Sequence, residues 1–436
     1  MPSAHQSSHH CRFLISACVS LSVGCSDKTM GFGGACPSSI DGIESAMEEG
    51  LFLIDGEAID ELDEFEQTIQ DYMFEYGIPN ASVAMISGDD RLVLERSYTN
   101  YCGGNKEGRG YYHPSRETTT VDHRFRIASI SKLVTATTLT HMTQEDPDTI
   151  NLHETLMKYV ALEPAADWDA DGVLDTQDSR LADMILLDMA THRPGWSCQN
   201  SDDTEDELRV GDATKKDFAV QDAYSSIGVS LDLPLSSDDL IGYVSGLPLA
   251  WDPGSTWSYC NHGYMLLGTV IESVYGNSYA DEAQSRVLSH IPDHVFALGS
   301  TRLEDRLENE VRYYHLTDTL TDSVMEEGAR VEKPYGRFNL ENREATAGWV
   351  ARARDVAGLG RAFLSGSIVD HIDSLMNDQI GWNMNFRGRT DATGHTGSLE
   401  GTHSILLCHG DTDANPILQE ACWSILFNKS PPDEFT

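Results

Sequence analysis

The sequence predicts an α+β fold: an antiparallel sheet built from the N- and C-terminal segments and flanked by helices, with an inserted, mostly helical domain. Near the N-terminal end of the 436-residue chain, Ala81–Ile86 and Leu92–Glu95 flank a Gly-Asp-Asp turn, which predicts a β-hairpin. Near the C-terminal end, Ser404–Leu407 and Trp423–Phe427 are also β-rich. The stretch from about 135 to 345 has mostly helical spacing. Strands at both ends around a helical middle favour a sheet with a helical insertion.

Composition indicates a globular protein with an unusual charge. A hydrophobic content of 40% is ordinary, and the length allows a sizeable core. The 70 acidic residues exceed the 30 basic ones, which gives a formal net charge of −40. Because such a charge repels polyanions, we expect neither nucleic acid nor an anionic membrane surface as a partner.

Residues 1–25 have the features of an export signal. Arg12 precedes an apolar run that ends at Cys25 and is too short to span a bilayer. Leu-Ser-Val-Gly-Cys resembles a bacterial lipobox, with its leucine one position early; Cys25 would then be lipidated and attach the protein to a membrane. A plain secretory signal cut nearby is the alternative. We expect an exported protein, periplasmic, membrane-anchored or secreted, with a tether at 26–56 and a folded domain at 57–430.

The remaining cysteines permit disulfides. Of the nine cysteines, three lie in the export signal, and six follow it. An even number in an exported protein is typical of disulfide pairing, although the pairing itself stays open. Cys408 and Cys422 flank a turn-rich stretch between two apolar runs, and we predict a bridge across that hairpin.

Four segments show a helical pattern of apolar residues. These are Ile59–Tyr76, which Gly77-Ile78-Pro79 ends, and Asp183–His192, Met265–Val274 and Asp355–Leu364. A further predicted helix, which begins at Phe125-Arg-Ile-Ala-Ser-Ile-Ser-Lys132, contains the first candidate catalytic residues.

Ser129 and Lys132 are the first candidate catalytic residues. They stand at i and i+3, so both side chains leave the helix on one face. A serine hydroxyl needs a base within hydrogen-bond reach to act as a nucleophile, and a lysine that burial keeps neutral can be that base. Free N–H groups at a helix start favour a developing oxyanion. The pattern is short, and its chance occurrence on a solvated helix is the alternative.

Two further short motifs contain side chains that can take part in catalysis. Tyr259-Cys-Asn261 follows a Pro-Gly turn, and a phenol near a cationic lysine can carry protons. His395-Thr-Gly-Ser398 lies on a glycine-flanked segment that we predict to be extended, where glycine lets a substrate approach the backbone. A loop histidine is the alternative for the second group.

These three groups, in this order, resemble the motifs of the serine hydrolases of the β-lactamase fold. That family includes class C β-lactamases, D-Ala-D-Ala carboxypeptidases, D-aminopeptidases and β-lactamase-like esterases. Flanking segments resemble family landmarks as well: Gly77–Ala84, Phe125–Ser129, Leu187–His192, Ala347–Trp349 with Asp355, and Gly394–Thr402. The resemblance covers about residues 57–430 and implies a β-lactamase/transpeptidase-like fold.

The resemblance implies a role for each matching residue. Ser129 would be the acylated nucleophile and Lys132 its partner base. Tyr259 would activate the serine or protonate the leaving group, and would then activate the deacylating water. Asn261 would orient the substrate and Lys132, and the backbone N–H groups of Ser129 and Ser398 would form an oxyanion hole.

His395 departs from the family pattern, because β-lactamases and carboxypeptidases carry a lysine there that binds the substrate carboxylate. Histidine is mostly neutral near pH 7, so His395, Thr396 and Gly397 would bind a substrate without that cation. The function predicted is therefore an exported serine hydrolase that acts on small esters through an acyl-enzyme. The alternatives are a D-amino-acid peptidase or amidase, a β-lactamase, or a non-catalytic binding protein. At Cys260, where serine is frequent, we expect a buried free thiol, with a disulfide as the alternative.

Residues 167–178 resemble a calcium-binding loop of the EF-hand type. Acidic residues stand at loop positions 1, 3, 5, 9 and 12, with Gly172 at the sharp turn. Position 12 is Asp where Glu is usual, which is more similar to dockerin or thrombospondin repeats. A chance cluster in an acidic chain is the alternative. The predicted ligands of a structural Ca²⁺ are Asp167, Asp169, Asp171, Val173, Asp175 and Asp178; we expect no catalytic cofactor.

Overall fold

The computed structural model describes residues 52–59, 62–100, 117–198, 217–317, 319–370, 379–384, 392–409 and 421–430. The export signal, Cys25 and most of the expected tether lie outside these residues. Among the described helices, none combines the length and the apolar character that crossing a membrane requires.

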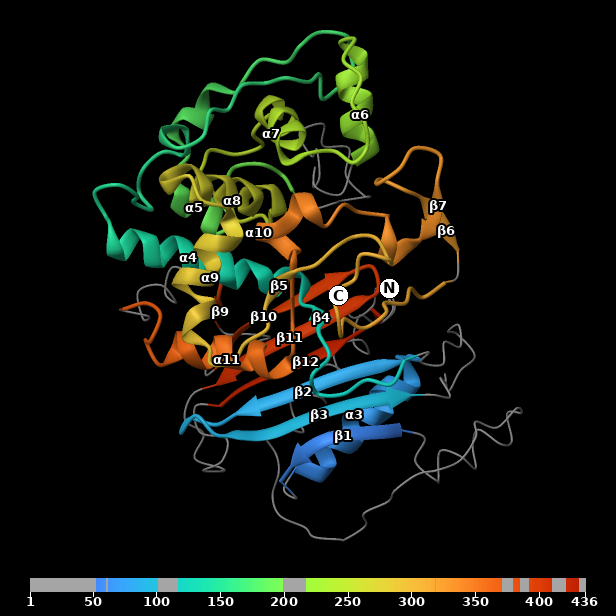
Figure 1. The fold of residues 1–436 in the computed structure, drawn as a ribbon. Helices are drawn as coiled ribbons and strands as arrows, with labels where there is room; N and C mark the ends of the chain where they lie inside the picture. The colour runs from blue at the N-terminus through green and yellow to red at the C-terminus, as the bar shows by residue number, and fades with distance from the viewer. Residues whose placement is uncertain are drawn as a thin grey trace, which may run out of the picture.

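The two ends of the chain build one seven-stranded antiparallel sheet (Figure 1). Its strands, in spatial order, are β1 (Phe52–Ala58), β3 (Leu92–Asn100), β2 (Asn80–Ile86), β12 (Cys422–Phe427), β11 (Thr402–His409), β10 (Ala392–Leu399) and β9 (Asn383–Met384). The N- and C-terminal strands meet where β2 pairs with β12, with Val83 opposite Ile425. This arrangement confirms the predicted α+β fold class.

The strand β1 lies partly inside the stretch 26–56, for which we expected a tether. It pairs with β3 along its whole length, with Phe52 opposite Asn100. Most of its side chains are exposed or half-buried, as on an edge strand. Because such a strand needs no continuous apolar face, its periodicity is weak, and the free edge of β3 determines its structure.

Helices cover both faces of the sheet. On one face, α3 (Asp63–Glu75) buries Phe65 and Ile69 in a cluster that includes Val83 and Ile425. On the other face, α11 (Ala353–Leu364) packs against β12 and β2. Because side chains alternate along a strand, each face has its own hydrophobic core.

The helical part of the molecule lies on the α11 side of the sheet (Figure 1). Its α-helices are α4 (Ser131–Glu145), α5 (Leu186–Ala190), α6 (Asp217–Ser226), α7 (Ser237–Gly246), α8 (Asn261–Tyr275), α9 (Tyr279–Arg286) and α10 (Glu344–Ala347). The helix predicted at 183–192 is thus reduced to α5, preceded by a 3-10 turn. Helix α4 is buried on all sides from Ser131 to Thr140, so it forms the centre of this region.

Two short sheets complete the fold. One joins β4 (Phe125–Arg126), β8 (Trp349–Ala351) and β5 (Ala297–Leu298), and the other joins β6 (Leu320–Asp322) and β7 (Arg330–Glu332). Strand β4 leads directly into the predicted nucleophile, so its pairing with β8 helps to place Ser129.

The disulfides differ in part from the prediction. Cys408 and Cys422 are bonded across the β11–β12 pair, as predicted. Cys260 is bonded to Cys198, so the expectation of a free thiol is wrong. The two residues are 62 positions apart, and only the tertiary structure brings their segments together.

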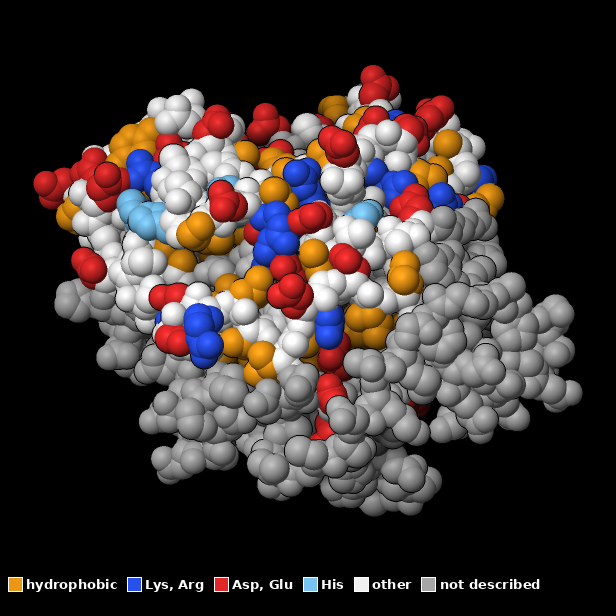
Figure 2. Space-filling view, turned by 60° about the horizontal axis from the view of Figure 1, so that its bottom comes forward, with side chains coloured by type: hydrophobic (Ala, Val, Ile, Leu, Met, Phe, Trp, Pro, Cys, Tyr) orange, Lys and Arg blue, Asp and Glu red, His pale blue; other side chains and the backbone are white. Residues whose placement is uncertain are grey.

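Charges of both signs are mixed on the surface. On the face drawn in Figure 2, acidic, basic and apolar side chains are interspersed. Arg354, for example, contacts both Glu95 and Asp122. Such exposed or half-exposed pairs contribute little stability individually.

Candidate active site

Ser129 lies on a 3-10 turn, η2 (Ala128–Ile130), that immediately precedes α4. Ala128 has φ of +48°, a left-handed conformation that is uncommon outside glycine. Backbone strain of this kind persists only where the surroundings enforce it, and it gathers at functional sites. The turn therefore presents the serine in front of the helix, instead of within its first α-helical turn.

Arg126 fixes the strand that leads into this turn. Its buried guanidinium donates to the carbonyl oxygens of Pro334 and Ser300, at 2.7 Å each, and lies 4.4 Å from the centre of the Tyr313 ring. Its backbone N–H donates to the Tyr313 hydroxyl at 2.7 Å. Residues at positions 300, 313 and 334 thus hold Arg126, which stands three positions before Ser129.

The predicted Ser129–Lys132 pair lies within hydrogen-bond reach. Lys132 is fully buried, and its Nζ donates to Ser129 Oγ at 3.2 Å and to the carbonyl of Thr346 at 2.8 Å. The carbonyl belongs to α10, so that helix directs the ammonium group toward the serine. This geometry is the one that proton transfer between the two side chains requires.

Tyr259 and His395 join this pair. Lys132 Nζ lies 5.2 Å from the centre of the Tyr259 ring, and the ring centres of Tyr259 and His395 are 6.3 Å apart. Asn261, two residues after Tyr259, begins α8. Side chains from α4, the loop before α8 and β10 therefore converge on one place.

The charge of His395 is determined by its surroundings. The side chain is 4% exposed on β10. Burial, reinforced by the Lys132 ammonium, lowers the pKa of His395 to about 4. The imidazole is therefore neutral at pH 7, as expected for a site without the family's second lysine.

Gly397 places β10 directly beside the nucleophile turn. A Cβ atom at this position would lie 2.4 Å from the Ile127 carbonyl oxygen and 2.9 Å from Ala128 Cβ. Ser404 on β11 donates to the same Ile127 carbonyl at 2.7 Å. Thr396 and Ser398 stand on either side of Gly397 in β10. The side chain of Thr396 is half-buried, and that of Ser398 is exposed.

The sequence reasoning missed His192, which packs directly on Tyr259. The ring centres are 4.4 Å apart, and His192 Nδ1 accepts a hydrogen bond from the backbone N–H of Cys260 at 3.1 Å. Burial, with the nearby charge of Lys132, holds the pKa of His192 well below its usual value. The segment Leu187–His192 resembled a family landmark, and that was the signal available in the sequence.

The predicted calcium loop is assembled only in part. Carboxylate oxygens of Asp167, Asp169 and Asp175 lie within 4.8 Å of one another. Asp178 is directed elsewhere: it pairs with Arg180 at 2.7 Å and accepts from that residue's backbone N–H. Asp171 also lies outside the cluster of three. A structural Ca²⁺ stays a prediction, now centred on these three carboxylates.

If Ca²⁺ binds this loop, chelation should lower the melting temperature by several degrees. Burial raises the pKa of Asp175, and a shared hydrogen bond with Asp167 raises that of Asp169, so a cation would relieve crowded negative charge. Thermal unfolding with and without EGTA measures the shift. Asp169→Asn should abolish it, and an unchanged melting temperature in the wild type would contradict the prediction.

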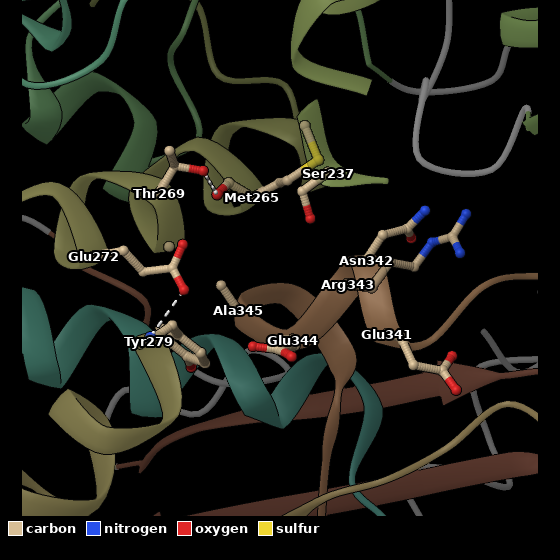
Figure 3. Close-up of a pocket in the computed structure, with 11 residues that line it drawn as sticks. Ser237, Met265, Thr269, Glu272, Tyr279, Glu341, Asn342, Arg343, Glu344 and Ala345 are labelled. Carbon is tan, nitrogen blue, oxygen red and sulfur yellow. Dashed lines mark hydrogen bonds between the residues drawn. The ribbon is translucent and has the colours of Figure 1, made fainter. Parts of the chain in front are cut away.

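A cavity of about 150 Å³ is lined by α8, α10 and the first residues of α7 and α9 (Figure 3). Glu272 and Glu344 extend into the space on either side of Ala345 (Figure 3). Burial, together with the charges of Glu272 and Glu341, raises the pKa of Glu344 to about 7. Glu344 is two residues before Thr346, which holds Lys132.

Glu344→Gln should stabilise the protein increasingly as the pH rises above about 4.5. The folded state retains the Glu344 proton up to about pH 7, whereas the unfolded state releases it near the ordinary value of 4.5. The stability linked to that proton is present below pH 4.5 and is lost as the pH rises through 7. The melting temperature of the variant should match the wild type at about pH 4 and exceed it at about pH 8. A melting-temperature difference that stays the same at both pH values would refute the assignment.

Comparison with known proteins agrees with this fold. The family model described as Beta-lactamase matches residues 65–436, which is most of the chain. Among solved structures, the octameric penicillin-binding protein homologue from Pyrococcus abyssi has a TM-score of 0.57 at 18% identity, over 86% of this chain and 75% of that one.

Two further structures are similar over more of their own length. The D-stereospecific amidohydrolase from Streptomyces sp. has a TM-score of 0.53 at 17% identity, covering 81% of this chain and 90% of that chain. The D-amino acid amidase from Ochrobactrum anthropi SV3, complexed with D-phenylalanine, has a TM-score of 0.53 at 19% identity, covering 83% and 89%. At these identities the likeness shows the fold. The family match extends over most of the folded chain, and the protein therefore belongs to the β-lactamase family of serine hydrolases.

Proposed function

We propose that this protein is an exported esterase that hydrolyses small neutral esters through an acyl-enzyme on Ser129. The observation that carries the ester preference is the neutral, buried His395. In this position β-lactamases and carboxypeptidases of the family have a lysine that binds the substrate carboxylate. A neutral ester needs no such partner, whereas an anionic substrate would lose an ion pair.

The arrangement of the other residues supports a two-step reaction. Ser129 Oγ would attack the ester carbonyl while its proton passes to Lys132 in its neutral form, or to the phenolate of Tyr259 beside a Lys132 ammonium. The backbone N–H groups of Ser129 and Ser398 would receive the developing oxyanion, since β10 lies beside η2. That acceptor would then give the proton to the departing alcohol, which leaves the acyl-enzyme. Water would attack the acyl-enzyme while Tyr259 takes a proton from it, and return of that proton to Ser129 Oγ would release the acid and restore the serine.

His395→Lys should shift the substrate preference toward anions. With a matched pair of p-nitrophenyl esters, one neutral and one with a terminal carboxylate, the wild type should favour the neutral ester about 10-fold in kcat/KM, which corresponds to about 1.4 kcal/mol. The lysine variant should narrow or reverse that ratio, because it returns a cation to the site. His395→Gln, which is neutral, should keep the wild-type ratio. A wild type that hydrolyses the anionic ester at least as fast would contradict the proposal.

Hydrolysis of D-amino-acid amides is the second candidate function. Two similar structures are those of a D-stereospecific amidohydrolase and a D-amino acid amidase, and small amide or ester substrates suit the family. Amide hydrolysis uses the same acyl-enzyme, with an amine as leaving group. A panel of D- and L-amino-acid amides beside the esters decides between the two.

Export is supported by the two disulfides among the described residues. Cys198–Cys260 and Cys408–Cys422 would form and persist in an oxidising compartment. Lipidation of Cys25 remains a separate proposal, for which membrane fractionation of wild-type and Cys25→Ser protein is the test; loss of membrane association in the variant would support the anchor.

A further inference from the structure

The loop that carries Tyr259 is fastened along its length to residues 192–198. Backbone N–H groups of Trp251, Gly254 and Ser258 donate to carbonyl oxygens of Gly195, Arg193 and His192, at 3.0, 2.8 and 2.8 Å. This pairing holds the loop, which makes a turn at 253–255, beside the shorter segment. Tyr259 stands at the end of the paired stretch, immediately before α8.

Both neighbours of Tyr259 bind His192. The N–H of Ser258 donates to the His192 carbonyl, and the N–H of Cys260 donates to its Nδ1 at 3.1 Å. The imidazole also lies against the phenol ring, with the ring centres 4.4 Å apart. His192 itself has φ of +57°, so its backbone is held in an uncommon conformation to make these contacts.

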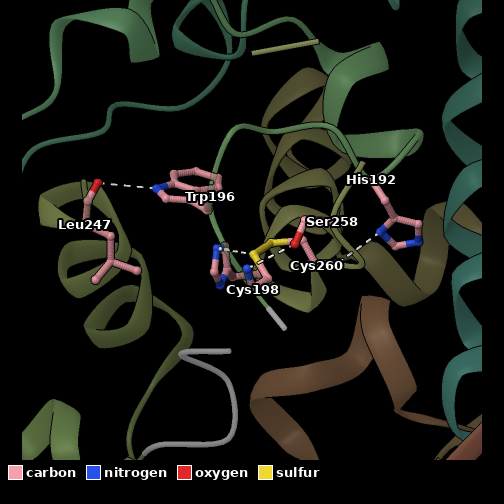
Figure 4. Close-up of a disulfide and its surroundings, with 7 residues drawn as sticks. His192, Trp196, Cys198, Leu247, Ser258 and Cys260 are labelled. Carbon is pink, nitrogen blue, oxygen red and sulfur yellow. Dashed lines mark hydrogen bonds between the residues drawn. A yellow bond between two sulfur atoms is a disulfide. The ribbon is translucent and has the colours of Figure 1, made fainter. Parts of the chain in front are cut away.

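The Cys198–Cys260 disulfide closes this arrangement on the other side (Figure 4). Cys260 is fully buried, and the N–H of Cys198 donates to Ser258 Oγ at 3.2 Å. Trp196 Nε1 donates to the Leu247 carbonyl at 3.3 Å, which secures the same segment to the end of α7 (Figure 4). The residues on either side of Tyr259 are thus bound covalently and by hydrogen bonds to one short segment.

We propose that the Cys198–Cys260 disulfide, together with His192, positions Tyr259 for proton transfer, so that acyl transfer depends on the oxidation state of this disulfide. The inference rests on the proposed function, in which Tyr259 carries a proton. Position 260 lies within the Tyr-x-Asn motif itself, and a cross-link there constrains the phenol directly. A misplacement of about 1 Å at a catalytic group can cost about 10²-fold in rate.

Reduction by a dithiol would remove the covalent link between the loop and residues 192–198. The S–S bond breaks, the dithiol supplies two electrons and two protons to Cys198 and Cys260, and the reductant becomes a disulfide. His262 Nε2 lies 3.1 Å from Cys198 Sγ, where an imidazole can stabilise a thiolate. The hydrogen bonds to His192 would remain, but the covalent constraint on position 260 would be gone.

The test compares two disulfide deletions of similar chemistry. Cys198→Ser with Cys260→Ser should lower kcat for a p-nitrophenyl ester by about 10- to 100-fold, with KM changed less than about threefold. Cys408→Ser with Cys422→Ser removes the bridge between β11 and β12, and should lower the melting temperature without this loss of kcat. Assays run well below both melting temperatures separate rate from stability. A Cys198/Cys260 variant with wild-type kcat would overturn the proposal.

A reduction experiment covers the case in which the double variant does not fold. In the Cys408→Ser/Cys422→Ser protein, dithiothreitol should lower kcat by the same factor, and reoxidation should restore it while circular dichroism stays native. Unchanged kcat after mass spectrometry has shown complete reduction would overturn the proposal.

The contribution of His192 is tested by a conservative replacement. His192→Ala removes the acceptor for the Cys260 N–H, whereas His192→Asn keeps an acceptor and tolerates positive φ. We expect kcat to fall in the alanine variant and to be partly restored in the asparagine variant. If both variants have the kcat of the wild type, His192 acts only on stability.

Failure of this inference is distinguishable from failure of the proposed function. If Ser129→Ala abolishes turnover but the disulfide variants keep the wild-type kcat, only the positioning role is refuted. If the wild type hydrolyses no ester and a fluorophosphonate does not label Ser129, the proposed function itself is refuted.

Discussion

Ser129→Ala should lower kcat for a p-nitrophenyl ester by about 10⁴- to 10⁶-fold, because the acyl-enzyme can no longer form. The hydroxyl accepts a hydrogen bond from buried Lys132 at 3.2 Å, so its removal deletes the nucleophile and leaves the lysine bound to the Thr346 carbonyl. The fold should persist, since a small side chain replaces another on a short turn. Steady-state kinetics with a melting curve for each protein measures both effects.

Ser131→Ala is the matched control for this prediction. Ser131 is two residues away and buried, but its Oγ accepts from the backbone N–H of Trp349 at 3.2 Å and does not contact Lys132 Nζ in the described hydrogen bonds. Its loss should cost stability of about 1 kcal/mol. A fluorophosphonate should label the wild type and Ser131→Ala, but not Ser129→Ala; labelling of the last would place the nucleophile elsewhere.

Gly397→Ala should have the second-largest effect, on activity and stability together. The new Cβ would lie 2.3 Å from Ser404 Oγ and 2.4 Å from the Ile127 carbonyl oxygen, so β10 must move away from the nucleophile turn. Overpacking of this kind costs about 1–3 kcal/mol, and displacement of one oxyanion donor costs roughly 10²–10³ in kcat. Thermal unfolding and ester kinetics measure the two losses.

Two variants sharpen the interpretation of the Gly397 result. Adding Ser404→Ala removes one of the three clashes, but those with the Ile127 carbonyl and Ala128 Cβ remain, so activity should not return. Gly263→Ala, on α8, introduces a Cβ at an ordinary 3.6 Å from Met189 Cβ and should keep activity within about twofold and stability unchanged or higher. Full activity in Gly397→Ala would show that β10 does not contribute to the oxyanion site as proposed.

Local patterns predicted the elements with strong periodicity or turn chemistry. The hairpin of β2 and β3 follows from alternating apolar residues around a turn, and the Cys408–Cys422 bridge follows from two cysteines on paired strands. Ser129 and Lys132 were recognisable because their spacing alone puts them on one face. These features depend on residues close in sequence.

Features that depend on distant segments were missed or only partly predicted. The strand β1 is stabilised by the edge of β3, and Asp178 accepts a hydrogen bond from the backbone N–H of Leu249 at 3.3 Å. No spacing rule connects these partners. The disulfide between Cys198 and Cys260 was likewise not predictable from the sequence around either residue.

The sequence by itself determined the fold class, the family resemblance and the three groups that carry the chemistry, because those features are encoded in short motifs and in their order along the chain. The tertiary structure decided the charge of His395, the contact of β10 with the nucleophile turn, and the constraint that His192 and Cys198 impose on Tyr259. The physical reason is that burial, close packing and covalent pairing arise between residues tens to hundreds of positions apart.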